Sequence, residues 1–285
     1  MKRASTIFGA TLLLLGRLAA AADIAGTDWN SESLARLNGV DKAAVVAFVN
    51  AVPGNTGDMQ STDLLDFRWV DLAGDGKAAL VMLTATGPCC ANVLIYRRAP
   101  SGAITQEVLP NVGVDLRTGI RDLDGDGKSE LIARQDVDAL DGYRGIRPAA
   151  LWTAVYRFKK GKYVEASREF TSFYDAEVLP KLDAAVARAN QRVAALPADA
   201  GGDEATDARR KSAVLEVERN KTLRILGRPT TTGLSKAREW VTSSDPDLVA
   251  DAMIVLRATG SSERELRAAQ EALERARERE RTAHP

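Results

Sequence analysis

The stretch DLDGDGKSEL, from Asp122 to Leu131, places four carboxylates around two glycines. Counted from Asp122 as position 1, the acids stand at positions 1, 3, 5 and 9, and position 7 is a lysine. Oxygen ligands at this spacing, with a backbone carbonyl at position 7, are how a tight loop surrounds a hard cation. The glycines permit the positive φ angles that fold the loop back on itself. The predicted ligands are Asp122, Asp124, Asp126, Lys128 through its carbonyl oxygen, and Glu130.

Calcium is the predicted ion, and two alternatives to a bound ion stay open. An acidic, glycine-rich turn can be held without a metal by hydrogen bonds from its carboxylates to backbone N–H groups. A basic neighbour could also offset the charge. Magnesium fits less well, because it demands stricter octahedral geometry. An EF-hand would need Glu at position 12, where the chain has Ala133, and a helix where ELIAR is typical of a strand.

A second stretch, DLAGDGKAAL, has the same glycines but fewer acids. Asp71 and Asp75 hold positions 1 and 5, whereas Ala73 and Ala79 replace the carboxylates at positions 3 and 9. Two carboxylates and one carbonyl offer too few oxygens for calcium. We expect this first loop to keep its turn and to hold no ion, with weak occupancy as the alternative.

The two cysteines are adjacent, in GPCCANV. In an oxidising compartment two thiols should pair. Neighbouring Cα atoms lie ~3.8 Å apart, below the ~4.4 Å that ordinary disulfides need, so a Cys89–Cys90 bond would close a small, strained ring. Free thiols or an intermolecular bond are the alternatives, and a redox-sensing role would need support that the sequence does not provide.

Catalytic signatures are scarce. The single histidine, His284, lies next to the last residue, which argues against a Ser-His-Asp or Cys-His arrangement. No nucleophile elbow, P-loop or zinc spacing is present. A polar segment inside the second repeat is either an ordinary loop or a recognition surface; its charged and aromatic residues are Asp136, Asp138, Asp141, Tyr143, Arg144 and Arg147.

The N-terminus has the order of a secretory signal peptide. Lys2 and Arg3 precede a short apolar run, and small residues follow up to Ala22, after which we expect cleavage. The run is shorter than the ~20 residues of a membrane span, although Arg17 leaves a signal anchor as the alternative. We therefore expect a periplasmic or secreted protein that does not span the membrane once residues 1–22 are removed.

Charge excludes two classes of partner. Acidic and basic side chains number 39 each, and loss of the leader would leave an excess of about three acids. The chain has no basic block typical of nucleic-acid binding and no polybasic helix typical of anionic membranes.

Residues 64–170 repeat one β-unit twice. FRWVDLAGDGKAALVML resembles RTGIRDLDGDGKSELIAR, and NVLIYRRAPSGAITQEVL resembles TAVYRFKKGKYVEASREF. The second pair predicts two β-hairpins that turn at Gly102 and Gly161. A period of about 50 to 60 residues is typical of propeller blades, but two blades cannot close a propeller. We expect one continuous antiparallel sheet or a small sandwich.

Helices flank the repeats on both sides. Residues 23–63 contain one predicted helix, SESLARLNGVDKAAVVAFVNAV, capped by Ser31 or Ser33. Residues 171–285 are rich in Ala, Arg, Glu and Leu and predict several helices, the last with a narrow stripe of Leu and Ala among charged residues. The predicted fold class is therefore α+β: a propeller-blade-like, two-copy antiparallel β-unit with an N-terminal helix and a helical C-terminal region.

The two D-x-x-G-D-G loops and their strands resemble the calcium loops of integrin α-subunit FG-GAP repeats and the related VCBS repeats of bacterial exported proteins. The resemblance covers residues 64–170. It implies calcium ligands at the same five residues of the second loop. It identifies a module rather than an activity.

The sequence thus favours an exported, non-enzymatic protein with a calcium-stabilised β-module, serving binding or a structural role in the envelope. A periplasmic inhibitor or immunity-type protein is one alternative. A carboxylate-dependent hydrolase acting on glycans is the other, and two opposed carboxylates across a cleft would favour it. The sequence does not identify the protein or glycan partner.

Overall fold

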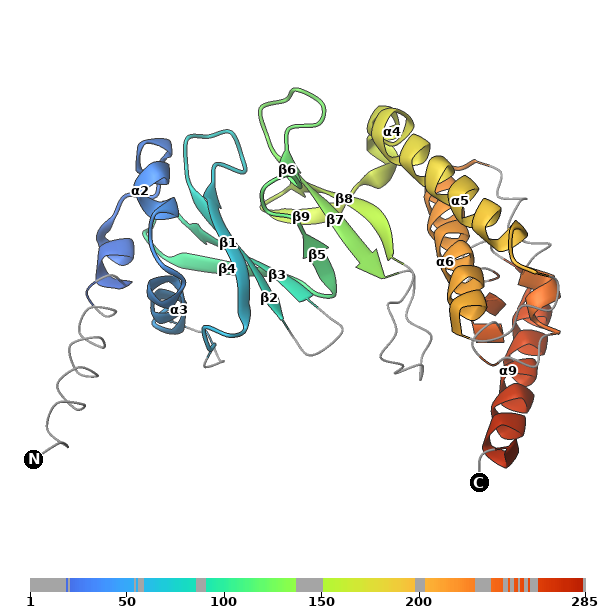
Figure 1. The fold of residues 1–285 in the computed structure, drawn as a ribbon. Helices are drawn as coiled ribbons and strands as arrows, with labels where there is room; N and C mark the ends of the chain where they lie inside the picture. Colours follow the sequence, from blue (N-terminus) through green and yellow to red (C-terminus); the bar gives the residue numbers. More distant parts are fainter. Residues whose placement is uncertain are drawn as a thin grey trace, which may run out of the picture. The chain divides into compact units, whose positions relative to one another are not determined.

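A computed structural model describes residues 19, 21–53, 55, 59–85, 91–136, 151–197, 203–228, 237–242, 246, 249–250, 252–253, 256 and 261–283 (Figure 1). Cys89, Cys90, the polar segment 137–150, His284 and most of the predicted leader lie outside these ranges. Among the described residues, none of the helices combines the length and the apolar character needed to cross a membrane.

The described elements confirm the predicted α+β class. The helices include the 3-10 turns Ser31–Ser33 and Ser167–Glu169, α2 (Leu34–Asn38), α3 (Lys42–Asn50), α4 (Thr171–Phe173), a π turn (Tyr174–Val178), α5 (Leu179–Ala194), α6 (Asp203–Ile225) and α9 (Glu263–Ala283). The strands are β1 (Leu64–Val70), β2 (Ala79–Ala85), β3 (Ala91–Arg98), β4 (Ile104–Leu109), β5 (Val112–Val114), β6 (Ile120–Arg121), β7 (Glu130–Asp136), β8 (Leu151–Lys159) and β9 (Lys162–Glu165).

The chain divides into two compact units. One comprises Met1–Ala133 with Tyr156–Glu165, and the other comprises Arg134–Val155 with Ala166–Pro285. The first unit contains both acidic loops, and the second contains α5, α6 and α9. The candidate metal centre therefore lies within the first unit.

Each copy of the repeat builds its own sheet, so of the two arrangements expected, one continuous sheet or a small sandwich, the continuous sheet was wrong. The first sheet has the order β1-β2-β3-β4, and the second has the order β5-β7-β8-β9 with β6 paired to β7. The two predicted hairpins are confirmed, with β3 antiparallel to β4 and β8 antiparallel to β9. Their turns contain Gly102 and Gly161, whose φ angles are 82° and 87°.

The predicted N-terminal helix is two helices instead of one. After α2 the chain turns at Gly39, and Asp41 caps α3 by accepting a hydrogen bond from the Ala44 N–H at 2.7 Å. The aspartate stops one helix and starts the next because its side chain satisfies an N–H that the helix itself leaves free. The apolar spacing had hidden this break. Ser33, one of the two predicted caps, occupies the N-cap position of α2 but makes no capping hydrogen bond through its side chain, and Asn30 caps the preceding 3-10 turn.

The core of the first sheet is aromatic. The ring of Trp69, on β1, lies 4.7 Å from the ring of Trp29, which in turn lies 5.6 Å from the ring of Phe48 on α3. All three side chains are buried, together with Leu37 of α2. α2 and α3 therefore cover one part of this sheet with the apolar face that the sequence predicted (Figure 1).

The outer edge of β1 is covered by side chains from these two helices. Asn38 accepts a hydrogen bond from the Trp69 N–H at 2.8 Å and donates to the Trp69 carbonyl at 2.9 Å. The Lys42 ammonium donates to the Leu64 carbonyl at 3.2 Å. An unpaired strand edge is a template for association with another strand. These contacts occupy backbone groups on the edge of β1 and so protect it from such pairing.

The two loops stack in register, and the N-terminal segment 28–31 extends the stack. Ser129, at position 8 of the second loop, donates its N–H to the carbonyl of Leu72, at position 2 of the first, at 2.8 Å. Ala78, at position 8 of the first loop, donates to the carbonyl of Trp29 at 3.0 Å. Segment 28–31 therefore accepts a hydrogen bond from position 8 of the first loop, in the same way that the first loop accepts one from position 8 of the second.

In the second unit, α5 and α6 lie side by side (Figure 1). Pro180 stands in the first turn of α5, where its missing N–H is tolerated. Gly227 follows α6 with a φ of 71°, as expected for a helix terminator. The predicted stripe of α9 is confirmed, since Ala269, Leu273 and Ala276 are buried among exposed charges.

Candidate metal centre

The second acidic loop connects β6 to β7. The backbone of Arg121 lies opposite the backbone of Glu130 in the antiparallel β6–β7 ladder, so the two ends of the loop lie side by side. Gly125 and Gly127 have φ angles of 79° and 80°, which other residues adopt only at a cost of about 1–2 kcal/mol. The sequence therefore folds the chain so that positions 1 and 9 come together.

The acids at positions 1 and 5 hold the turn itself. Asp122 accepts hydrogen bonds from the N–H groups of Gly125 at 2.7 Å and Gly127 at 2.9 Å. Asp126 accepts from the Lys128 N–H at 2.9 Å. Lys128 also brings its ammonium to 3.3 Å from Asp126. The role predicted for its carbonyl stays a prediction.

The first loop makes one such bond at each of the same two positions, and Asp71 Oδ1 is buried without a hydrogen-bond partner among the described residues. Asp71 accepts from the Gly76 N–H at 2.8 Å, and Asp75 accepts from the Lys77 N–H at 3.1 Å. Because this loop has alanine at positions 3 and 9, the turn forms without carboxylates there. The turn can therefore form without acids at positions 3 and 9, although in the second loop Asp124 accepts from the Asp126 N–H at 3.3 Å and Glu130 accepts from the Leu123 N–H at 2.9 Å.

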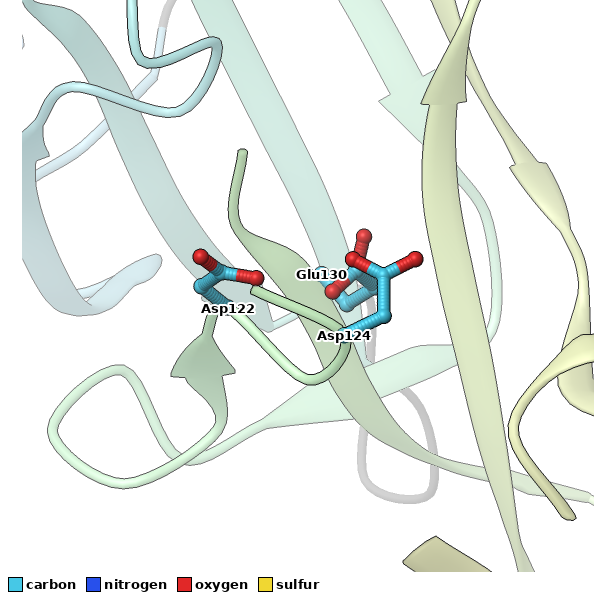
Figure 2. Close-up of side chains that lie close together, drawn as sticks. All are labelled: Asp122, Asp124 and Glu130. Carbon is cyan, nitrogen blue, oxygen red and sulfur yellow. The ribbon is translucent and has the colours of Figure 1, made fainter. Parts of the chain in front are cut away.

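Three of the four predicted acidic ligands come together. Asp122, Asp124 and Glu130 each offer one carboxylate oxygen, and these oxygens all lie within 4.8 Å of one another (Figure 2). Asp122 and Asp124 are exposed to solvent, whereas Glu130 is buried. Asp126 is not part of this group.

Glu130 is the unusual member of the group. Its residue exposure is 0%, and its Oε2 accepts a hydrogen bond from the Leu123 N–H at 2.9 Å. Its Oε1 is buried and has no hydrogen-bond partner within the described part of the chain. Burial raises the pKa of Glu130 above its ordinary value, and the nearby carboxylates of Asp124 and Asp126 raise it further.

A basic side chain that the sequence patterns did not reveal reaches into the same loop. Arg157, on β8, places Nη2 2.7 Å from Asp124 Oδ2 and 2.7 Å from Asp126 Oδ2. Its Nε lies 3.8 Å from Glu130 Oε1, too far for a hydrogen bond. The Lys128 N–H and the Arg157 guanidinium together lower the pKa of Asp126 to about 2.

The arginine at the equivalent place in the first copy points elsewhere. Arg97 aligns with Arg157 in the repeated YR of IYRRA and VYRFK. It pairs with Glu107 at 2.9 Å and lies over the ring of Phe158, 4.5 Å from the centroid. The alignment could have drawn attention to both arginines, but it carries no signal for which of them enters a loop.

The arrangement can bind a cation. Its groups are carboxylates within one turn, a buried glutamate and an arginine, with hydrogen-bonded backbone amides around them. Comparison with protein-family models, with curated proteins and with solved structures found no match. The resemblance to calcium-loop repeats thus depends on the sequence of the two loops and their flanking strands.

Proposed function

We propose that this protein is an exported, non-enzymatic binding or envelope structural protein whose second β-unit is stabilised by calcium. Asp122, Asp124 and Glu130 would contribute carboxylate oxygens, and Asp126 and the Lys128 carbonyl would complete the set. The observation that carries this proposal is the Glu130 carboxylate, buried with an unbonded Oε1 beside the carboxylates of Asp122 and Asp124.

The energetics of Glu130 favour an ion. A buried carboxylate without its full complement of partners costs folding free energy, and in this loop two like charges stand within a few ångströms of it. Arg157 offsets part of this charge but leaves Oε1 without a hydrogen bond. A divalent cation would supply the missing partner and would attract Asp122 and Asp124 at the same time.

Calcium suits the donors better than other ions. All of the proposed ligands are oxygens, which hard cations prefer. Two of the carboxylates are exposed, so the loop can adjust its ligand distances and admit water, as flexible calcium sites do. We expect a dissociation constant near ~10⁻⁴ to 10⁻³ M, the range of extracellular modules.

The N-terminal packing is compatible with export. Ile24, two residues after the predicted cleavage point, is 1% exposed in the core, and Asp23 pairs with Arg36. Ala21 is also buried, so cleavage after Ala22 would remove one small side chain from this core. The partner would be a protein or glycan outside the cytoplasm.

Glu130→Gln tests the calcium site. Thermal unfolding of the mature chain should show a midpoint that rises with millimolar Ca²⁺, falls in chelator and responds much less to Mg²⁺. At ~100 times the dissociation constant the ion should add ~2.7 kcal/mol to the free energy of unfolding. The substitution keeps the size of the side chain and its acceptor for Leu123, but removes the charge that attracts the ion, so most of the rise should disappear.

Glu107→Gln is the matched control. Glu107 is also an acid paired with an arginine, Arg97, but it lies outside the loop on β4. Its loss should lower the midpoint equally with and without Ca²⁺. If the wild-type midpoint is the same in chelator and in millimolar Ca²⁺, the loop is only a turn and the proposal is wrong.

A further inference from the structure

We propose that Arg157 is a built-in counter-ion of the second loop that competes with the divalent cation and sets its affinity. This inference rests on the proposed function, because it concerns the regulation of the same loop. It starts from one observation: a single guanidinium contacts Asp124 and Asp126 at 2.7 Å and approaches the buried Glu130.

The competition follows from shared oxygens. Asp124 belongs to the group that could hold the ion, and its Oδ2 already contacts the guanidinium. A divalent ion bound between Asp122, Asp124 and Glu130 would stand a few ångströms from the arginine. Two positive charges at that distance repel strongly where water is partly excluded, so either the ion binds weakly or the guanidinium leaves Asp124.

Arg157 is held in this position by its surroundings. Its side chain is 20% exposed, and its strand β8 is paired with β9, where Phe158 lies opposite Tyr163. The Tyr163 hydroxyl donates to the carbonyl of Ser129, at the end of the loop, at 2.9 Å. The strand that carries the arginine is therefore tied to the loop that receives it.

The charges show why one arginine does not replace the ion. The loop contains four carboxylates, and Arg157 and Lys128 place positive charge against Asp124 and Asp126. The Oε1 of Glu130 still lacks a hydrogen-bond partner in the described part of the chain. We infer that Arg157 stabilises the ion-free form of the loop and that calcium binding moves the guanidinium away from Asp124.

Arg157→Gln should produce two opposite effects. In chelator the midpoint should fall below that of the wild type, because the carboxylates lose their counter-ion. In calorimetric titration of the mature chain with Ca²⁺, the dissociation constant should fall by about tenfold or more, because the competing charge is absent. Loss of a merely structural contact would lower the midpoint without tightening calcium binding.

Two control variants separate contact from charge. Lys128→Gln removes the same unit charge from the loop, but Lys128 contacts only Asp126 among the proposed acidic ligands, so calcium should bind less than about threefold more tightly. Arg97→Gln removes the equivalent arginine of the first copy, which pairs with Glu107, and should leave the calcium dissociation constant unchanged.

The outcomes distinguish this inference from the proposed function. If neither the wild type nor Arg157→Gln binds Ca²⁺, the proposed function is wrong and this inference falls with it. Equal dissociation constants for the two proteins would overturn the inference alone. If Arg157→Gln does not fold, Arg157→Lys serves instead. The lysine lacks the planar fork that contacts both aspartates, so binding should tighten by about threefold, and an unchanged constant would overturn the inference.

Discussion

The two acidic loops form the same kind of turn but differ in how many carboxylates they contain and in how that negative charge is offset. Both have glycines with positive φ at positions 4 and 6 and hydrogen bonds to the acids at positions 1 and 5. The first loop has alanines at positions 3 and 9, and its equivalent arginine pairs elsewhere. The second adds Asp124 and Glu130 and receives Arg157.

This difference separates the architecture of the turn from its chemistry. Positions 1, 4, 5 and 6 build the turn in both copies, with or without the other acids. Positions 3 and 9 add charge that the turn does not need. A chain that keeps Glu130 buried in one copy and has Ala79 at the same place in the other therefore contains its own control for ion binding.

The largest expected effect concerns the contact between the loops. A Cβ added to Gly74 would lie 2.0 Å from the Gly127 carbonyl oxygen, whereas one added to Gly125 would meet nothing within 4 Å. Both glycines have positive φ. Gly74→Ala should therefore lower the free energy of unfolding by about 2–5 kcal/mol, the sum of backbone strain and overpacking. Gly125→Ala should cost only the strain, about 1–2 kcal/mol.

Urea denaturation of the two variants gives these values directly. The pair is matched, because the same substitution is made at position 4 of each loop. Equal losses would show that the loops do not press against one another at Gly74.

The next effect concerns calcium. Asp124→Ala gives the second loop the alanine that the first has at position 3. It should remove most of the ~2.7 kcal/mol that Ca²⁺ adds at ~100 times its dissociation constant. Asp75→Ala, in the first loop, should lower the midpoint through loss of the bond to the Lys77 N–H while the rise with Ca²⁺ remains. A similar loss of response in both variants would mean that the loops bind ions alike.

Much of the fold could be predicted from the sequence, because its patterns are local. The repeated loop, the alternation of the hairpins and the glycines of their turns are all short-range signals, and the structure confirms them at Gly102 and Gly161. The apolar stripe of α9 was equally predictable, since the spacing of its apolar residues is set within a single helix. The break at Gly39 was hidden because the apolar spacing continues across it and masks the capping signal at Asp41.

The candidate site was predictable only in part. The spacing of acids identified Asp122, Asp124 and Glu130 because all of them lie within one turn. Arg157 comes from a strand far along the chain, and only the pairing of strands brings it to the loop. The same holds for segment 28–31, whose similarity to a loop becomes visible in its hydrogen bonds to residues 76–78. Long-range contacts of this kind leave no periodic signal in a single sequence.

The smallest expected effect is a change in acid stability. Asp126 has its pKa lowered to about 2 by the Lys128 N–H and by Arg157, against ~3.9 for an aspartate in an unfolded chain. A group whose pKa is lower in the folded state stabilises the fold above the unfolded value and loses that contribution as the pH falls towards the folded value. In chelator, the wild type should therefore lose stability between about pH 4 and pH 2.

Asp126→Asn should make this acid limb shallower, because an amide does not titrate. Part of the limb should remain, because the pKa values of Asp115, Asp175 and Glu265 are lowered as well. Asp75→Asn is the matched change at position 5 of the first loop. It leaves the contact between Asp126 and Arg157 in place, so the acid limb of the wild type should remain. The measurement is the thermal midpoint from pH 2 to pH 6 in chelator, compared among the three proteins. If the three profiles run parallel, the Lys128 N–H and Arg157 do not hold the pKa of Asp126 below its unfolded value, and the electrostatic difference between the two copies is lost.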